Sequence, residues 1–289
     1  MTAKLLTGKE RAQEILESLK PRIAAAHPGL GIIQVGSDPA STTYIAEKVR
    51  ACEQVGIQTF QSQLPEDTPI ADILQKVRDM NAVKRVSGLI VQFPLPGPLR
   101  QYEPEFIKLL DPSKDVDCFT EENVKKISEK KSLDEFRSTL SPGTPLGVLE
   151  LLDYHQIPIA GKVIAVIGQG RTAGKPLSKM LKQLGGQVHV CDSKTPRQEL
   201  EDLCSNRADI IISAVGTPGI IPAAIIRQGA EVINIGSKRG TDGSYLPDIE
   251  IENAMEVASA ITPMIGGVGP LTVACLLRNT VLAAELNNK

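Results

Sequence analysis

Residues 163–176 read VIAVIGQGRTAGKP, a run of five apolar residues that ends in a glycine-rich turn. The apolar run predicts a buried strand, and the residues after the turn predict a helix. Gly168 and Gly170 let the backbone approach a pyrophosphate, and the helix N-terminus offers amide donors to it. The spacing is G-x-G-x-x-x-G rather than the stricter G-x-G-x-x-G, and Arg171 follows the second glycine. The stretch therefore predicts dinucleotide binding, although glycine also serves simple tight turns between a strand and a helix.

Strand and helix patterns alternate on both sides of this stretch, which is typical of parallel sheets covered by helices. Before it, the sequence predicts helices over 8–26, 40–55 and 68–81 and strands over 30–35, 57–63 and 87–93. A helix over 146–155 leads into the second series. After 163–167, strands are predicted near 187–191, 208–214, 231–235 and 257–261, with helices that begin near 172, 196 and 221.

A polar, charged segment over 111–145 separates the two series and is interpreted as the domain crossing. The last apolar helix, 271–286, is expected to pack back on the first domain. The predicted fold class is therefore α/β, with two α/β domains around a cleft. The first domain comprises residues 1–140 plus 271–289, and the second, 141–270, is a Rossmann-like parallel sheet that binds a dinucleotide.

The composition is that of an ordinary globular protein, with 289 residues, 42% hydrophobic and 23% charged. A net charge of −2 gives no general attraction to nucleic acid or to an anionic membrane. Neither a membrane-spanning stretch nor a signal peptide is evident, so a cytoplasmic location is expected. The five cysteines and three histidines lack metal-ligand spacing, which predicts free thiols and no metal.

Tyr44 and Lys48 are four residues apart on the predicted helix 40–55, so their side chains lie on one helix face. Most such pairs belong to a solvated surface. A lysine in a dry cleft is different, because desolvation lowers its pKa toward neutrality. It can then exchange protons as a general base and acid.

Gln92 closes the buried strand in GLIVQFPLP, residues 88–96, and places an amide at the sheet edge where α/β proteins bind ligands. A polar strand end before a rigid loop is the alternative. Asp115 and Asp117, in KDVD at 114–117, would project on the same side of an extended segment. They could bind a metal, for which other ligands are not evident, or hydrogen-bond to a nitrogen-rich ring. A solvated charged turn also accounts for them.

Two more segments are candidates for ligand contact. TPMIGGVGPLT, residues 262–272, combines three glycines with a proline before a long helix, so its backbone can touch a ligand closely. Asp192 follows the strand 187–191 and could accept hydrogen bonds from an adenosine ribose. Ser193 or Lys194 could reach a 2′-phosphate, whereas a solvated strand end or helix cap explains Asp192 equally well.

Taken together and in this order, these stretches resemble the bifunctional methylenetetrahydrofolate dehydrogenase/cyclohydrolase family. The resemblance covers nearly the whole chain. It rests on YxxxK at 44–48, GLIVQFPLP at 88–96, KDVD at 114–117, GTPLGVLELL at 143–152, GKPL at 174–177 and TPMIGGVGPLT at 262–272.

The resemblance implies oxidation of 5,10-methylenetetrahydrofolate to the methenyl form with NADP or NAD, followed by hydrolysis to 10-formyltetrahydrofolate. Lys48 would be the central catalytic group, Gln92 would position it, Tyr44 would orient the folate and Asp117 would anchor the pterin. Further folate contacts would come from Val91, Phe93, Ile265, Gly266, Gly267, Val268 and Gly269. The cofactor would be held by Gly168, Gln169, Gly170, Arg171, Asp192, Ser193 and Ser237. The family also implies one-carbon metabolism, a link to purine biosynthesis, and a homodimer through the nucleotide-binding domain.

The chain departs from the family pattern mainly on the cofactor side. Gln169 stands where the family usually has an arginine for the 2′-phosphate, and Asp192 replaces the usual histidine. Arg171 and Lys194 are the basic residues that could compensate from other positions. The family prior favours NADP, whereas Gln169 and Asp192 make NAD possible. Cys118 stands where the family has a glycine after KDVD.

Three other hypotheses stay open. A dehydrogenase of the same architecture could act on another small substrate, such as an amino acid or a polyol, which would leave the Tyr44, Lys48, Gln92 and Asp117 set unexplained. Alternatively, the chain could be a dehydrogenase only, or could bind folate or nucleotide without turnover. The altered cofactor loop permits the last hypothesis, and the intact lysine site argues against it.

Overall fold

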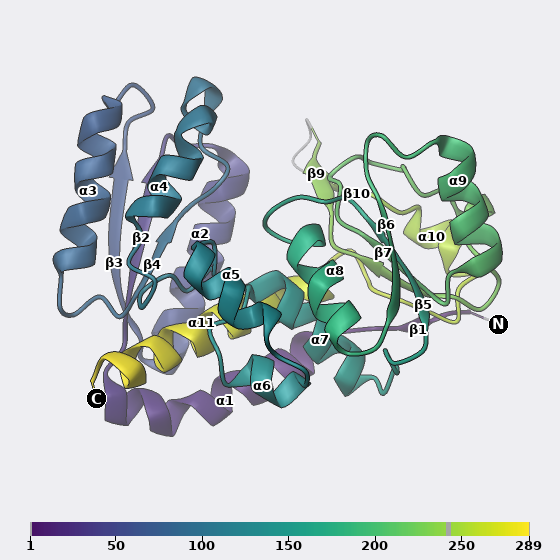
Figure 1. Cartoon of the computed structure of the whole chain (residues 1–289), viewed down its shortest axis with the longest axis horizontal. Helices are drawn as coiled ribbons and strands as arrows, with labels where there is room; N and C mark the ends of the chain where they lie inside the picture. The colour runs from purple at the N-terminus through teal and green to yellow at the C-terminus, as the bar shows by residue number, and fades with distance from the viewer. Residues whose placement is uncertain (1, 241–243, 289) are drawn as a thin grey trace. The chain divides into compact units, whose positions relative to one another are not determined.

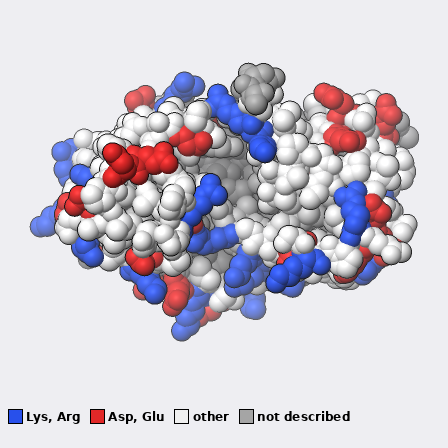
Figure 2. Space-filling model, turned by 90° about the horizontal axis from the view of Figure 1, so that it is seen from above, with Lys and Arg blue, Asp and Glu red and all other residues white. Residues whose placement is uncertain are grey.

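The computed structural model describes residues 2–240 and 244–288. The chain forms two compact units. Unit 1 comprises Met1–Ala12, Lys130–Leu133 and Thr144–Thr272, and unit 2 comprises Gln13–Glu129, Asp134–Gly143 and Val273–Lys289. Both contain a parallel sheet with helices, so the prediction of two α/β domains is confirmed (Figure 1). In the part of the chain that the structure describes, none of the helices could cross a membrane. Acidic and basic side chains are interspersed on the face shown in Figure 2.

Unit 1 is built on a six-stranded sheet in the order β1-β11-β8-β7-β5-β6. Every neighbouring pair is parallel. The strands are β1 (Lys4–Leu5), β5 (Val163–Ile167), β6 (Gln187–Cys191), β7 (Ile210–Ser213), β8 (Glu231–Asn234) and β11 (Ala260–Ile261). From β5 the chain goes first to one side, β6, and then to the other, β7. This reversal creates a topological switch point at the carboxyl ends of β5 and β7, where open α/β sheets bind ligands.

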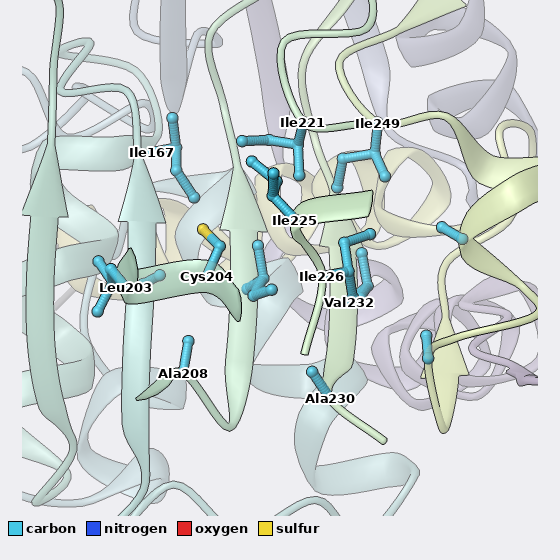
Figure 3. Packing of buried hydrophobic residues seen from close by; sticks show 14 of the residues in the cluster. Ile167, Leu203, Cys204, Ala208, Ile221, Ile225, Ile226, Ala230, Val232 and Ile249 are labelled. Atoms are coloured by element: carbon cyan, nitrogen blue, oxygen red, sulfur yellow. The ribbon is translucent and has the colours of Figure 1, made fainter. Parts of the chain in front are cut away.

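The helices of unit 1 are α7 (Gly143–Tyr154), α8 (Gly174–Gln183), α9 (Arg197–Asp202) and the single turn α10 (Ile251–Ala254). An antiparallel hairpin, β9 (Ser237–Arg239) and β10 (Tyr245–Pro247), follows β8. Aliphatic side chains of the strands and of the segments between them form one core cluster, as Figure 3 shows for Ile167 of β5, Val232 of β8, Leu203, Ile221 and Ile225.

The prediction of a helix that begins near residue 221 is wrong. Only a 3-10 turn, Ala223–Ile225, is present there. Ile221 instead forms a parallel bridge with Ile249. The apolar residues that suggested a helix are buried in the core, with Ile221 and Ile249 both at 0% exposure.

Unit 2 contains a three-stranded parallel sheet in the order β3-β2-β4. The strands are β2 (Gly29–Val35), β3 (Gln58–Leu64) and β4 (Gly88–Val91). All residues of the central β2 are buried, as expected for a strand covered on both faces. The shorter helices assigned wholly or mainly to this unit are α2 (Pro39–Val55), α3 (Ile70–Ala82), the 3-10 helix η1 (Gly97–Tyr102), α4 (Glu103–Leu109), α5 (Glu121–Ser128) and α6 (Leu133–Arg137).

Two long helices, α1 (Lys9–Ala26) and α11 (Val268–Asn287), have most of their residues in unit 2. The guanidinium of Arg22 donates two hydrogen bonds to the carboxylate of Glu285, at 2.8 and 2.7 Å, and so joins these helices. The segment 111–145, expected as a polar crossing, contains α5 and α6. The fully buried Phe136 of α6 gives that part of the segment an apolar anchor.

Candidate active site

The predicted catalytic residues of unit 2 gather around Lys48. Helix α2 begins where the carboxylate of Asp38 accepts a hydrogen bond from the amide of Ser41, 2.8 Å away. Tyr44 and Lys48 then lie one turn apart; Tyr44 is 43% exposed and Lys48 is partly buried. The Nζ of Lys48 donates a hydrogen bond to Oε1 of Gln92 at 3.1 Å. The structure therefore brings together two residues 44 positions apart, whose contact the family resemblance implies.

Gln92 is held in a fixed orientation at the carboxyl end of β4. It follows Val91, the last residue of the strand, and its own amide donates to the carbonyl of Ile33 on β2 at 2.9 Å. Its side-chain Nε2 donates to the carbonyl of Phe93 at 3.0 Å. The other end of the amide, Oε1, is consequently directed to Lys48 as a hydrogen-bond acceptor.

Burial lowers the pKa of the Lys48 amine below its ordinary value, and the nearby Asp117 carboxylate opposes the shift. Burial likewise raises the pKa of Asp117, while the charge of Lys48 acts in the other direction. Cys52 lies one further turn along α2, and burial raises the pKa of its thiol to about 12. The thiol therefore stays protonated and neutral at physiological pH, so it adds no charge beside Lys48.

The two carboxylates of KDVD have different surroundings. Asp115 is fully buried, and it accepts hydrogen bonds from the amides of Phe119 and Thr120 and from the Thr120 hydroxyl, at 3.1, 2.8 and 2.7 Å. The expectation of an extended segment with both carboxylates on one side is wrong. The chain turns after Asp115, where the amide of Cys118 donates back to the Asp115 carbonyl at 3.3 Å. Asp115 thus anchors the loop, and Asp117 is left to interact with Lys48.

Cys118 has a φ of +61°, in the left-handed region that favours glycine. This conformation accounts physically for a glycine at the corresponding position of the family pattern. In this chain a buried cysteine adopts it, and burial raises the pKa of its thiol well above the ordinary value.

A polar cavity of about 440 Å³ adjoins Gln92 in unit 2. It lies beyond the carboxyl ends of β2 and β4, and its lining includes Gln34, Ser37, Asp38, Ser41, Gln92 and Arg100. Phe93, next to Gln92, packs edge-to-face against Phe119 with ring centroids 5.6 Å apart. Gln92 therefore contributes both to the lysine site and to a hollow at the edge where parallel sheets bind ligands.

The glycine loop of unit 1 lies at the switch point of the six-stranded sheet. Gly168 has a φ of +96°, and a Cβ there would lie 2.5 Å from the carbonyl oxygen of Ala214, which follows β7. At Gly174, which begins α8, a Cβ would meet the Gly168 carbonyl oxygen at 1.9 Å. A Cβ at Gly170 would instead meet no described atom within 4 Å. The loop is tightly packed beneath and open at Gly170, a geometry that fits a pyrophosphate at a helix N-terminus.

The side chains that depart from the family pattern are accommodated locally. Gln169 donates to the carbonyl of Gly168 at 2.9 Å and to the hydroxyl of Ser178 on α8 at 3.3 Å, so it braces the loop. Arg171 is exposed on the turn. Asp192 follows β6 beside the loop, because the Gly168 amide donates to the carbonyl of Cys191 at 2.8 Å.

The Asp192 carboxylate accepts from the amide of Lys194 at 2.8 Å, and its own amide donates to the hydroxyl of Thr195 at 3.0 Å. The local turn therefore orients Asp192, while Ser193 between these residues is exposed. The structure thus brings Asp192 and Ser193 next to the glycine loop, where the carboxylate and hydroxyl can face a ribose.

The remaining predicted residues also belong to unit 1. Ser237 begins β9 after Gly236, and it is partly buried. In the loop 265–269, Ile265 is 75% exposed, whereas Gly266, Gly267 and Val268 are buried and Gly269 is exposed. Gly266 has a φ of +86°, and its carbonyl accepts from the amide of Gly8 at 2.8 Å. This loop and the Lys48 group are thus assigned to different units.

Two informative residues escaped sequence reasoning. Asp248 is a buried carboxylate whose donors are brought to it by a turn, and Cys52 is the neighbour of Lys48 one helical turn on. The i, i+4 spacing that singled out Tyr44 and Lys48 also connects Lys48 to Cys52 and could have identified it. Among the described residues, no group of three or more acidic, histidine or cysteine side chains is placed to hold a metal.

Comparison with known proteins agrees with this geometry. The model of the tetrahydrofolate dehydrogenase/cyclohydrolase catalytic domain matches residues 6–117, and the model of the NAD(P)-binding domain matches residues 142–288. The bifunctional protein FolD of Acetivibrio thermocellus is 41% identical over 294 residues, which cover 100% of this chain and 99% of that relative.

Two solved structures are similar over nearly their whole length. The methylenetetrahydrofolate dehydrogenase-cyclohydrolase of Trypanosoma brucei, complexed with NADP and an inhibitor, has a TM-score of 0.91 at 29% identity and covers 100% of this chain and 99% of that one. The bifunctional enzyme FolD of Campylobacter jejuni has a TM-score of 0.88 at 33% identity, with 98% and 99% covered. The chain therefore belongs to the tetrahydrofolate dehydrogenase/cyclohydrolase family.

Proposed function

We propose that this chain carries out both activities of its family with Lys48 and Gln92 at the centre of the reaction. The activities are the NAD(P)-linked oxidation of 5,10-methylenetetrahydrofolate to the methenyl form and the hydrolysis of that form to 10-formyltetrahydrofolate. The observation that carries the proposal is the 3.1 Å hydrogen bond between Lys48 and Gln92, together with the lowered pKa of the lysine.

The neutral form of Lys48 suits both reactions. The substrate carbon becomes cationic when it loses hydride, and a fixed positive charge beside it would oppose this step. In the hydrolysis, the neutral amine accepts a proton from the attacking water and supplies one to the nitrogen that leaves the ring. Gln92 accepts a hydrogen bond from the amine and so directs the lone pair of the Lys48 nitrogen. Gln92 is therefore a positioning residue.

Folate contacts are proposed for the residues around this pair. Asp117 would hold the pterin ring, whose amino group and ring nitrogen suit a carboxylate acceptor. The exposed ring of Tyr44 would pack against the folate, and Val91 and Phe93 would flank it. The loop at Ile265, Gly266, Gly267, Val268 and Gly269 would lie along the folate.

NAD(P) fits the glycine loop because that loop is open at Gly170 and closed beneath by the contact of Gly168 with Ala214. Gly168, Gln169, Gly170 and Arg171 would hold the pyrophosphate, Asp192 and Ser193 the adenosine ribose, and Ser237 the nicotinamide end. When bound, NAD(P) supplies the hydride acceptor for the oxidation. Hydrolysis needs no hydride acceptor, so the two activities can be separated by substitution in unit 1.

The wider setting is also a proposal. We expect folate to bind to the domain predicted as 1–140 plus 271–289 and the dinucleotide to 141–270, in a cytoplasmic enzyme whose products feed purine biosynthesis. A homodimer through the nucleotide-binding domain is expected from the family. Light scattering of the purified chain would measure it, and a monomeric mass at micromolar concentration would contradict it.

The test compares the parent with Lys48→Met in two assays, formation of methenyltetrahydrofolate with NAD or NADP and its decay without cofactor. General acid and base catalysis contributes about 10²- to 10⁴-fold, so the variant should lose cyclohydrolase activity by at least about 100-fold. Lys76→Met, on α3 of the same unit, is the matched control and should keep both activities. Full cyclohydrolase activity in Lys48→Met would refute the role of Lys48. Folate and cofactor binding without turnover by the parent would favour a binding protein instead.

A further inference from the structure

A buried carboxylate joins the segments that follow three neighbouring strands of unit 1. Asp248 comes directly after β10 and is fully buried. Its Oδ2 accepts hydrogen bonds from the hydroxyl of Ser213 and the amide of Val215, and its Oδ1 accepts from the amide of Thr217, each at 2.8 Å. The loop after β7 therefore folds around this one side chain.

The segment after β8 is packed against the same carboxylate. A Cβ at Gly236 would lie 2.0 Å from Oδ2 of Asp248 and 2.7 Å from the amide nitrogen of Gly216, so only glycine fits there. The main-chain amide of Asp248 also donates to the carbonyl of Gly236 at 3.2 Å. Ser237, proposed to lie near the nicotinamide, is the next residue.

The glycine loop after β5 completes the arrangement. Gly168 packs against Ala214, where an added Cβ would lie 2.5 Å from the carbonyl oxygen. Ala214 stands between Ser213 and Val215, both of which donate to Asp248. A single carboxylate thus supports, directly or through one residue, the loops after β5, β7 and β8 at the switch point.

We infer that Asp248 is a positioning residue for the dinucleotide: it shapes the 214–217 loop and the Gly236–Ser237 turn into one wall of the cofactor site without touching the cofactor itself. This inference rests on the proposed function. Nothing in the sequence suggested it, because Asp248 is 80 positions from Gly168 and follows a hairpin that the pattern did not predict.

A carboxylate is required because all three partners donate. Two oxygens accept from two amides and a hydroxyl, and such charge-assisted bonds offset the cost of burying the group. An asparagine has the same shape but one oxygen and one NH₂ group. Whichever way it is turned, a donor faces the amide of Val215 or of Thr217, so the loop must move.

The experiment measures calorimetric binding of NADP and of NAD to the purified full-length chain, cyclohydrolase activity, and thermal unfolding. Asp248→Asn should weaken binding of the preferred cofactor at least tenfold and raise its KM by a similar factor. Its cyclohydrolase activity, which needs no cofactor, should stay within twofold of the parent. Ser213→Ala, which removes one of the three bonds and keeps both amides held, should weaken binding about threefold.

The matched control is Asp209→Asn. Asp209 also accepts a hydrogen bond from a backbone amide of unit 1, that of Val163 at 2.9 Å, but at the opposite, amino end of the strands. This variant should be less stable than the parent and keep the parental cofactor affinity. If destabilisation alone weakened cofactor binding, Asp209→Asn and Asp248→Asn would both bind the cofactor more weakly.

Parental cofactor affinity in folded Asp248→Asn would overturn the inference. If Asp248→Asn does not fold, Ser213→Ala is the deciding variant. A cofactor affinity of Ser213→Ala that is no weaker than that of Asp209→Asn would then overturn the inference. Failure of the parent itself to bind NAD or NADP would instead count against the proposed function.

Discussion

The Nζ of Lys48 on α2 lies 3.1 Å from Oε1 of Gln92 at the end of β4, and the other end of that amide is fixed on the carbonyl of Phe93. The lysine thus meets an uncharged acceptor that is oriented by its hydrogen bond to Phe93. The proposed chemistry needs this neutral partner, since a carboxylate in its place would keep the amine protonated.

Gln92→Glu tests that requirement. A carboxylate within hydrogen-bond distance raises a lysine pKa by about 1 to 3 units, so the rise of cyclohydrolase rate with pH should shift upward by about that amount. The pH–rate profile measures the shift. Gln101→Glu, an exposed change nearby in the sequence, should leave the profile unchanged, and an unshifted profile in Gln92→Glu would remove the proposed role of Gln92.

The parent enzyme should show its own pH dependence. Because burial lowers the Lys48 pKa below 10.5, cyclohydrolase activity should rise with pH and level off below that value. In the unfolded chain Lys48 binds its proton more tightly than in the folded chain. The contribution of Lys48 to the free energy of unfolding is therefore fully present above pH 10.5 and is lost as pH falls through the folded pKa. Lys48→Met should abolish this part of the pH dependence of unfolding. A rate that still climbs beyond pH 10.5 would contradict the lowered pKa.

Asp192→Asn should improve the use of NADP relative to NAD. The Asp192 carboxylate stands beside the glycine loop and would repel a 2′-phosphate. Removing one charge at a few ångströms in a solvated site is worth about 1 to 2 kcal/mol. The ratio of kcat/KM for NADP to that for NAD should therefore rise about 5- to 30-fold. Asp202→Asn, an exposed change on α9, is the control, and an unchanged ratio would show that Asp192 serves only its local turn.

The glycines at 168 and 170 should respond differently to alanine. At Gly168 the positive φ and the 2.5 Å approach of Ala214 oppose any side chain, so Gly168→Ala should lower thermal stability as well as cofactor affinity. At Gly170 a methyl group meets no described atom, so Gly170→Ala should unfold as the parent does and still bind cofactor more weakly. Calorimetry and thermal unfolding separate the two effects. Parental affinity in Gly170→Ala would place the pyrophosphate elsewhere.

Cys118 offers a test of backbone strain. In the left-handed region a non-glycine residue is disfavoured by about 1 to 2 kcal/mol. Cys118→Gly should therefore be more stable than Cys118→Ala by about 1 kcal/mol, the reverse of the usual order of these residues. Urea unfolding measures the difference, and the corresponding pair at Cys52, inside α2, should show alanine as the more stable.

Much of the site was predictable because its signals are local. The apolar run, the glycines and the following helix at 163–176 specify β5, its turn and α8 without distant information. Lys48 and Gln92 were predicted to meet because the family pattern contains both, and the parallel sheet places Gln92 at its carboxyl edge. The residue pattern alone left Lys48 as a plausible surface group and Gln92 as a plausible polar strand end.

The rest depended on contacts between distant segments. KDVD does not reveal that Asp115 is enclosed by the donors of residues 119–120, which leaves Asp117 alone with Lys48. The helix expected near 221 failed because Ile221 pairs with Ile249, a partner 28 residues away. Asp248 was missed for the same reason, since its donors lie at the end of β7 and on the loop that follows it. Local patterns indicate elements, whereas tertiary pairing decides which polar groups are left for ligands.

The assignment of residues to the two units has a consequence for how such an enzyme can be divided or evolve. The chain passes between the units five times, and neither is one continuous segment. Strand β1 forms an edge of the sheet of unit 1, although almost all of that sheet comes from the second half of the chain. A gene cut at any single point would thus give two incomplete products. Separation of the two activities is easier by point substitution than by loss of a domain.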